Sequence, residues 1–171
     1  MGAGGVKIPP ASYWPEIQRI CRKHDVLLML DEVITGYGRT GEWFAAQTFG
    51  IEADTITTAK ALTSGYQPLS ALLVGDRIAS TLVDKGGEFY HGYTYSGHPV
   101  ACAVALKNLE IIEGEGLVER VKTDTGPYFA QIASRTWQDQ ERFFYAMPYE
   151  ERYIWGVTAG IIRALYERLY T

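Results

Sequence analysis

The chain has 171 residues, of which 47% are hydrophobic and 21% are charged, and it carries a formal net charge of -4. This composition is typical of an ordinary globular domain and excludes collagen-like, intrinsically disordered and disulfide-scaffold proteins. The acidic balance, with no stripe of lysines and arginines, argues against nucleic acid or an anionic membrane as a partner.

Targeting signals and metal motifs are absent from the sequence. No run approaches the roughly 20 apolar residues of a membrane span, and the start of the chain lacks the layout of a signal peptide, so we expect a cytoplasmic protein. Cys21 and Cys102 are far apart and form no C-x-x-C pair, which predicts two reduced, partly buried thiols. The three histidines lack the spacing of metal ligands, and no metal site is expected.

The predicted elements begin with a loop and a helix. Glycines and prolines in residues 2–10 predict an extended loop, and apolar positions at helical spacing predict a helix over residues 15–24. The apolar run at residues 26–30 then predicts a strand buried on both faces of a parallel sheet, ending at Asp31. A short helix is predicted at residues 43–47, followed by a strand at 54–58.

Further along the chain the same alternation continues. A strand is predicted at residues 70–74, and His98-Pro99 opens a helix that the glycines at 114 and 116 end. Strands alternating with helices indicate an α/β domain. Residues 123–140 lose clear periodicity, which predicts a junction, and apolar positions at steps of three and four over 154–169 predict an amphipathic helix.

Asp31 and Lys60 are the first two candidates for chemistry. Asp31 ends a predicted buried strand, where ligands of open α/β sheets gather, and side-chain alternation places Asp31 and Val33 on one face and Glu32 on the other. The alternative for Asp31 is a turn or capping acid. Lys60 follows a buried, hydroxyl-rich segment, where an unpaired ammonium is costly, so it is either a functional amine or a surface lysine.

The third candidate is the segment 94–99, Thr94-Tyr95-Ser96-Gly97-His98-Pro99, directly before the best predicted helix. Hydroxyl groups and the amides of a helix N-terminus suit an anionic phosphate. The alternative is an ordinary N-capping loop.

Together these segments resemble the class III aminotransferases, the pyridoxal-phosphate enzymes that include the omega-amino acid:pyruvate transaminases. The resemblance runs from Gly2 to about Gln131 and rests on four motifs in family order: Gly2-Ala3-Gly4-Gly5-Val6-Lys7-Ile8-Pro9-Pro10, Leu30-Asp31-Glu32-Val33-Ile34-Thr35-Gly36-Tyr37-Gly38-Arg39-Thr40-Gly41, Thr57-Thr58-Ala59-Lys60-Ala61-Leu62-Thr63-Ser64-Gly65-Tyr66 and Thr94-Tyr95-Ser96-Gly97-His98-Pro99. It implies a fragment of the large domain of a fold-type I transferase, acting on an amine and a keto acid such as pyruvate, and a homodimer.

The resemblance also implies roles for individual residues. Lys60 would be the catalytic amine that forms a Schiff base with pyridoxal 5'-phosphate, and Asp31 would pair with its pyridinium nitrogen. Val33 would pack against the ring, and Thr94 would bind the phosphate of the neighbouring subunit. Arg39 stays unassigned between a loop ion pair and a substrate role.

The pattern departs from the family in two ways. The family's phosphate loop and ring-stacking aromatic have no counterpart in these 171 residues, so we expect an incomplete cofactor site. Residues 132–171 are expected to form an unrelated helical tail after the partial aminotransferase domain of residues 1–131. From about residue 141 that tail resembles the C-terminus of Nudix coenzyme A pyrophosphatases, without the Nudix box.

Two functions from different classes follow. The first is pyridoxal-phosphate-dependent transamination carried by a truncated chain. The alternative is a non-catalytic α/β module that has lost a competent cofactor site. A coenzyme A-linked hydrolase is disfavoured because the metal-binding Nudix box is missing.

Overall fold

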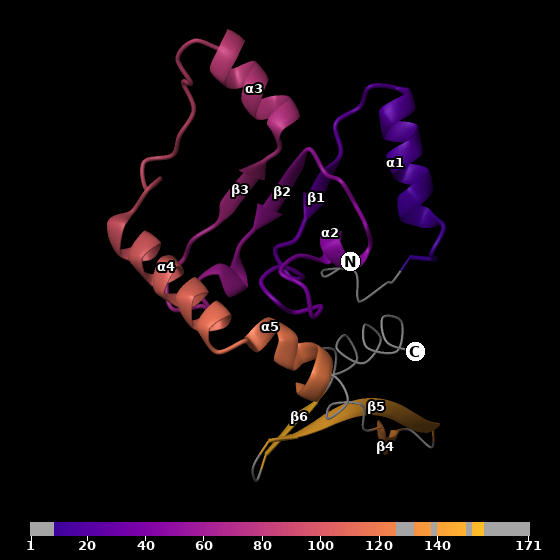
Figure 1. Cartoon of the computed structure of the whole chain (residues 1–171). Coiled ribbons are helices and arrows are strands. Elements are labelled where there is room, and N and C mark those ends of the chain that lie inside the picture. Colours follow the sequence, from indigo (N-terminus) through magenta and orange to yellow (C-terminus); the bar gives the residue numbers. More distant parts are fainter. Residues whose placement is uncertain (1–8, 126–131, 138–139, 150–151, 156–171) are drawn as a thin grey trace. The chain divides into compact units, whose positions relative to one another are not determined.

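The computed structural model describes residues 9–125, 132–137, 140–149 and 152–155 (Figure 1). The chain divides into two compact units: Ala11–Val118 forms one, and Met1–Pro10 with Glu119–Thr171 forms the other. We describe each unit by itself. The sequence placed the boundary later, near residue 131.

The unit Ala11–Val118 is built on a three-stranded sheet with the order β1-β2-β3. Its strands are β1 (Met29–Asp31), β2 (Thr55–Thr58) and β3 (Ala71–Val74). Its helices are α1 (Tyr13–Lys23), α2 (Ala45–Thr48), α3 (Asp76–Lys85), α4 (Pro99–Gly114) and the start of α5 (Leu117–Arg120), with a 3-10 turn, η1 (Lys60–Leu62), after β2. This arrangement confirms the predicted α/β class.

The sheet is mixed rather than parallel. β1 and β2 run parallel, as the sequence predicted, but β3 runs antiparallel to β2. The reversal follows from the segment between them, because η1 and a turn return the chain to the same edge without a crossover helix.

Helix α1 forms where the sequence predicts it and docks through a polar residue. The Gln18 amide nitrogen donates to the carbonyl of Gly50 at 3.2 Å, and its oxygen accepts the Glu52 amide at 2.9 Å. Glu16 in the first turn and Arg22 and Lys23 in the last complement the helix dipole. Local propensity and a satisfied buried amide therefore agree on the position of this helix.

The core of this unit lies on one face of the sheet. Leu30, Ala46 and Ile51 form its buried centre, and the partly buried residues packed against them are Trp14, Leu28, Phe44, Phe49, Ala53 and Ile56. The prediction that residues 26–30 are buried on both faces is wrong. Leu30 is 7% exposed but Met29 is 66% exposed, because successive side chains point to opposite faces and only the Leu30 face packs on this core.

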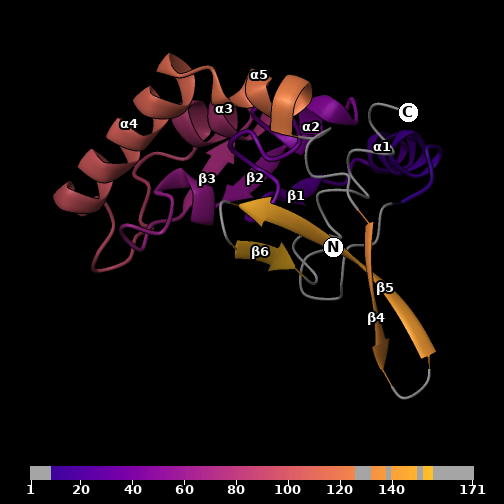
Figure 2. The same ribbon diagram turned by 90° about the horizontal axis from the view of Figure 1, so that it is seen from below.

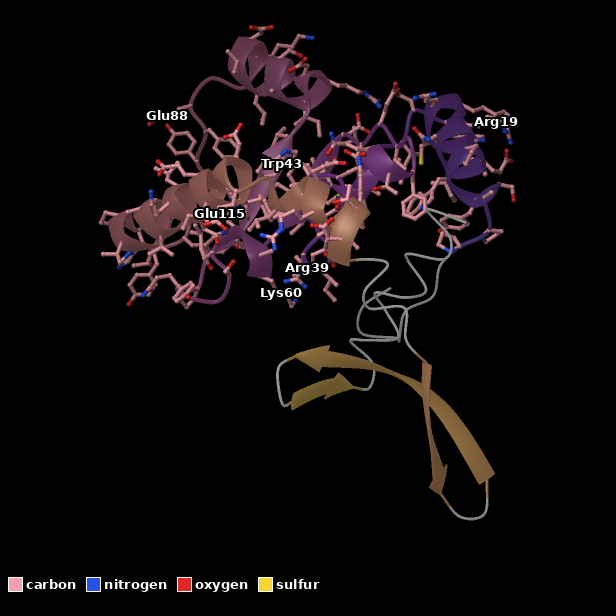
Figure 3. The ribbon with its side chains drawn as sticks, turned by 60° about the horizontal axis from the view of Figure 1, so that its bottom comes forward. Arg19, Arg39, Trp43, Lys60, Glu88 and Glu115 are labelled. Carbon is pink, nitrogen blue, oxygen red and sulfur yellow. The ribbon has the colours of Figure 1, made fainter. Side chains whose placement is uncertain are left out.

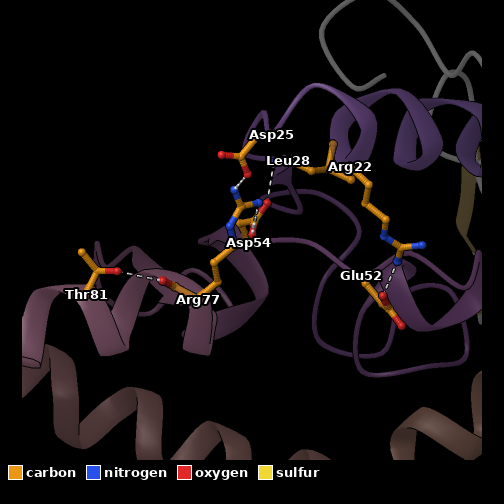
Figure 4. A network of polar contacts seen from close by, with 7 residues as sticks. All are labelled: Arg22, Asp25, Leu28, Glu52, Asp54, Arg77 and Thr81. Atoms are coloured by element: carbon orange, nitrogen blue, oxygen red, sulfur yellow. Dashed lines mark hydrogen bonds and ion pairs between the residues drawn. The ribbon is translucent and has the colours of Figure 1, made fainter.

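Helix α3, which the sequence analysis did not predict, is tied to the sheet by a polar network (Figure 4). The Asp54 carboxylate accepts the Leu28 amide at 2.7 Å, and its other oxygen lies 3.5 Å from the Arg77 guanidinium. Arg77 also pairs with Asp25. One arginine thus connects α3 to the segments that enter β1 and β2.

The described part of the other unit consists mainly of antiparallel strands (Figure 2). A π-helical segment, η2 (Val121–Thr125), is followed by β4 (Ile132–Trp137), β5 (Gln140–Tyr149) and β6 (Arg152–Trp155) in the order β4-β5-β6. The sequence predicted a helical tail here, but aromatic residues such as Phe143 and Phe144 favour strands. The helix predicted over 154–169 lies outside the described residues beyond Trp155.

Two further expectations concern burial and membranes. Cys21 and Cys102 are free thiols of intermediate burial, as predicted. In the part of the chain that the structure describes, every helix is too short or too polar to cross a bilayer.

Candidate active site

Asp31 and Lys60 lie at the same edge of the sheet. Asp31 is the last residue of β1 and pairs in register with Thr57 of β2, and the Glu32 amide donates to the Thr57 carbonyl at 2.9 Å. Lys60 begins η1 directly beyond the end of β2. Because β1 and β2 are parallel, their carboxyl ends meet, and this is the edge at which ligands of α/β sheets bind.

The turn after β1 holds Asp31 and Val33 together. Asp31 is exposed, and its carboxylate accepts the Val33 amide at 3.0 Å. The sequence derived their proximity from alternation along a strand, but β1 ends at Asp31 and Val33 lies in the following turn. A side chain that bonds the backbone two residues on is the usual way an aspartate closes such a turn.

Glu32 faces away from Asp31 and is almost completely buried, at 3% exposed. Its two oxygens accept the amides of Ala45 and Ala46, each at 2.7 Å, and the Thr35 hydroxyl donates to it at 3.0 Å. An anion suits these otherwise unpaired amides at the start of α2. Glu32 thereby anchors the segment that follows Asp31, a role the sequence analysis missed.

Tyr37 and Thr58 connect that segment to β2. The Tyr37 and Thr58 hydroxyl oxygens are 2.9 Å apart, and Thr58, which is fully buried, donates to the Ala71 carbonyl at 3.1 Å. A hydroxyl has one proton, so Tyr37 is the donor to Thr58. Tyr37 and Gly38 both have positive φ values, 61° and 94°. Glycine suits position 38 because a Cβ there would also lie only 3.2 Å from the Val118 side chain.

Lys60 follows the buried Thr55 and Thr58 as predicted, but its side chain is exposed, so the predicted cost of burying its ammonium does not arise. Thr58 before it and Leu62 and Thr63 after it are buried, and Lys60 is exposed between them at φ 41°, a left-handed conformation that is unfavourable for a residue with a Cβ. In the described part of the chain its amine has no hydrogen bond or ion pair. The amine is therefore available to a ligand at this edge.

Asn108 of α4 contacts the same turn, although it lies 44 to 47 positions further along the sequence. Its amide nitrogen donates to the carbonyls of Ala61 and Leu62 at 2.8 and 3.1 Å. Its oxygen accepts the Ser64 hydroxyl at 2.8 Å. The only sequence signal for this contact is a polar residue inside an apolar helix.

Thr94 lies apart from this constellation. It is exposed in the loop between α3 and α4, and no hydrogen bond or ion pair among the described residues joins it to Asp31 or Lys60. In the same loop, Ser96 accepts the Tyr93 amide at 3.0 Å and the His98 ring accepts the Ala101 amide at 3.4 Å. The capping alternative for residues 94–99 thus describes His98, and the Thr94 hydroxyl makes no hydrogen bond to any described residue.

Arg39 points outward in the view of Figure 3, as Lys60 does. Desolvation by the surrounding protein lowers the pKa of the Arg39 guanidinium, which stays a cation at neutral pH. The described residues contain no group of three or more histidine, cysteine, aspartate or glutamate side chains able to hold a metal ion.

The comparison with known protein families identifies the family of this chain. The model of the family described as aminotransferase class-III matches residues 1–142. The chain belongs to the class III aminotransferases. The match extends past the boundary near residue 131 that the sequence predicted, and it covers both motifs that carry Asp31 and Lys60.

Named aminotransferases are similar to most of the chain. It is 52% identical over 138 residues to a putrescine–pyruvate aminotransferase of Pseudomonas aeruginosa, covering 81% of this chain and 29% of that protein. It is 48% identical over 142 residues to a diaminobutyrate–2-oxoglutarate transaminase of Halomonas elongata, covering 81% and 30%. The chain thus spans less than a third of the length of these relatives.

Solved structures agree on the fold. An omega-transaminase from Thermomicrobium roseum is 42% identical with a TM-score of 0.68, covering 86% of this chain and 35% of that one. A transaminase from Virgibacillus is 41% identical with a TM-score of 0.72, covering 84% and 35%. Class III aminotransferases use pyridoxal 5'-phosphate, and the α/β unit described above is a fragment of the fold-type I architecture, as the sequence predicted.

Proposed function

We propose that this chain carries the Lys60–Asp31 half of a pyridoxal-phosphate site and that the protein it represents transfers an amino group from an amine or omega-amino acid to a keto acid such as pyruvate. The observation that carries the proposal is the placement of both charges at one edge. Asp31 ends β1, Lys60 follows the adjacent parallel strand, and neither has an ion-pair partner among the described residues.

The residues at this edge fit the cofactor by charge and position. An exposed carboxylate suits a protonated pyridine nitrogen, and an exposed, unpaired amine suits an aldehyde. Neighbouring strands lie about 4.8 Å apart, so groups that end them can contact opposite ends of one ring. Val33, half-buried and bonded through its amide to Asp31, would supply an apolar contact beside the ring.

Each residue would have a distinct role. The bound cofactor supplies an electron sink for the charge that develops on the substrate carbon. Asp31 would keep the ring nitrogen protonated by remaining an anion beside it. Lys60 would hold the cofactor covalently at rest; after release, its Nζ would accept the proton from the substrate carbon and return it to the cofactor carbon.

Thr94 is proposed to act across a homodimer. Its hydroxyl is exposed and has no hydrogen bond within the described residues, and the surrounding loop carries exposed aromatic side chains such as Tyr93 and Tyr95. Large exposed aromatics are enriched at protein interfaces. Thr94 would then donate to the phosphate of the cofactor held by the partner subunit.

Borohydride trapping tests the proposal directly. The chain is mixed with pyridoxal phosphate, reduced with borohydride, digested and mapped by mass, with Lys60→Arg and the exposed-lysine variant Lys107→Arg as a matched pair. We expect the cofactor mass on the peptide that contains Lys60, its loss in Lys60→Arg and its retention in Lys107→Arg. Labelling spread over surface lysines, or no labelling, would contradict the proposal and favour the non-catalytic α/β module.

A further inference from the structure

The turn that carries Lys60 needs support from outside itself. Lys60 and Ser64 both have positive φ values, 41° and 50°, which are unfavourable for residues with a Cβ. A 3-10 turn of three residues also leaves its last carbonyls without helical donors. Such a backbone persists only where the surrounding structure holds it.

One side chain supplies much of that support. The Asn108 amide group donates to the carbonyls of Ala61 and Leu62 at 2.8 and 3.1 Å and accepts the Ser64 hydroxyl at 2.8 Å. These contacts cover three of the four residues that follow Lys60. Thr63, only 2% exposed, closes the turn on its other side by donating to the Gln67 carbonyl at 2.5 Å.

Asn108 is placed for this contact by helix α4. It lies on the same helix face as the buried residues Ala101, Ala105 and Ile112, from which it is separated by seven, three and four positions. The two alanines are small and allow the helix to approach η1 closely, and α4 and η1 are in contact. A polar residue in this apolar stripe is favourable only if its hydrogen bonds are made.

We infer that Asn108 is a positioning residue for Lys60: its amide clamps the carbonyls of Ala61 and Leu62, holds the left-handed start of η1 and so fixes where the lysine amine emerges at the sheet edge. The inference rests on the proposed function for the use made of that amine. The chemistry requires an amide, because the side chain must donate two hydrogen bonds and accept one. A carboxylate has the same shape but no donor.

This requirement separates a clamp from simple packing. Asn108→Asp keeps the volume and replaces the two donated bonds with repulsion between oxygens, whereas Asn108→Ala removes all three bonds. Ser64→Ala removes only the bond to the Asn108 oxygen. Ile112→Val is the matched control, because it loosens the same buried face of α4 and leaves the three hydrogen bonds between Asn108 and the turn in place.

Hydrogen exchange of the cofactor-free chain is the first measurement. The Leu62 amide donates to Ala59 at 3.0 Å and the Thr63 amide to Lys60 at 3.3 Å, so both report on the turn. Losing two hydrogen bonds should speed their exchange about tenfold or more in Asn108→Asp relative to the β2 amides. In Ile112→Val we expect the turn and β2 to change together, and in Ser64→Ala a smaller local effect.

Trapping of pyridoxal phosphate is the second measurement. We expect the ratio of label on Lys60 to the background label on the exposed Lys23 of α1 to fall about tenfold in Asn108→Asp, as the turn loses its two donated bonds, and to stay unchanged in Ile112→Val. Loss of folding would lower the Lys60 label but not the label on an exposed surface lysine, so the ratio is compared only among variants that stay folded. Circular dichroism of each variant identifies any that fails to fold, in which case Ser64→Ala is used for both readouts.

The two proposals fail in different ways. If wild-type chain shows no selective label on Lys60 but Asn108→Asp still speeds exchange at Leu62 and Thr63, the proposed function is overturned and the clamp stands as a feature of the turn. If exchange at Leu62 and Thr63 in Asn108→Asp matches the control, or the Lys60 label ratio is unchanged, the positioning role of Asn108 is overturned.

Discussion

Replacing Glu32 with glutamine would test how the segment between β1 and α2 is held. The substitution keeps the size of the side chain but turns one of its two oxygens into an NH2 group. That group would face an amide of Ala45 or Ala46, which each donate to Glu32 at 2.7 Å in a site that is only 3% exposed. One backbone donor would be left buried without an acceptor.

The magnitude follows from those contacts. Hydrogen bonds to charged groups contribute about 1.5–3 kcal/mol each, and a buried unpaired donor costs about 1–3 kcal/mol, so we expect the free energy of unfolding to fall by about 2–3 kcal/mol. The matched control is Glu52→Gln, the same change at an ion pair with Arg22 whose carboxylate side chain is 84% exposed. Exposed pairs contribute up to about 1 kcal/mol.

Urea unfolding followed by tryptophan fluorescence, to which Trp14 and Trp43 of the same unit contribute, measures both variants. With a slope of about 2 kcal/mol per M, the Glu32→Gln midpoint should fall by about 1 M and the Glu52→Gln midpoint by less than about half of that. Equal midpoints for the two variants would refute the conclusion that the buried carboxylate of Glu32 anchors α2.

Two further predictions concern the sheet entrance and helix α1. Asp54→Ala removes the acceptor of the Leu28 amide and a partner of Arg77, so the free energy of unfolding should fall by about 1–3 kcal/mol. A fall no greater than that caused by Asp25→Ala in the same urea assay would contradict this prediction. The hydrogen bond from Arg19 lowers the pKa of the Glu16 carboxyl. The stability that this pair contributes is therefore present above the ordinary carboxyl pKa and is lost as the pH falls through the lowered pKa of Glu16. An NMR titration of Glu16 whose midpoint does not rise in Arg19→Ala would count against this prediction.

The sequence by itself determined the local elements and the chemistry of single residues. The spacing of Ile17, Ile20 and Cys21 predicted α1, and the Pro99 start with glycines after the apolar stripe predicted α4, because helix periodicity and end signals are local properties. The strands β1, β2 and β3 were also found close to their predicted places. The motifs around Asp31 and Lys60 were sufficient to indicate the family.

Tertiary structure decided burial, strand direction and the support of the site. The apolar run before Asp31 has the same sequence whether one face is covered or two, so the exposure of Met29 depends on what packs against the sheet. The antiparallel course of β3 and the outward turn at Lys60 depend on the path of the chain between them. Asn108 contacts the Lys60 turn although it is 46 positions from Leu62 and 47 from Ala61 along the sequence, and no local pattern encodes a contact between residues so far apart.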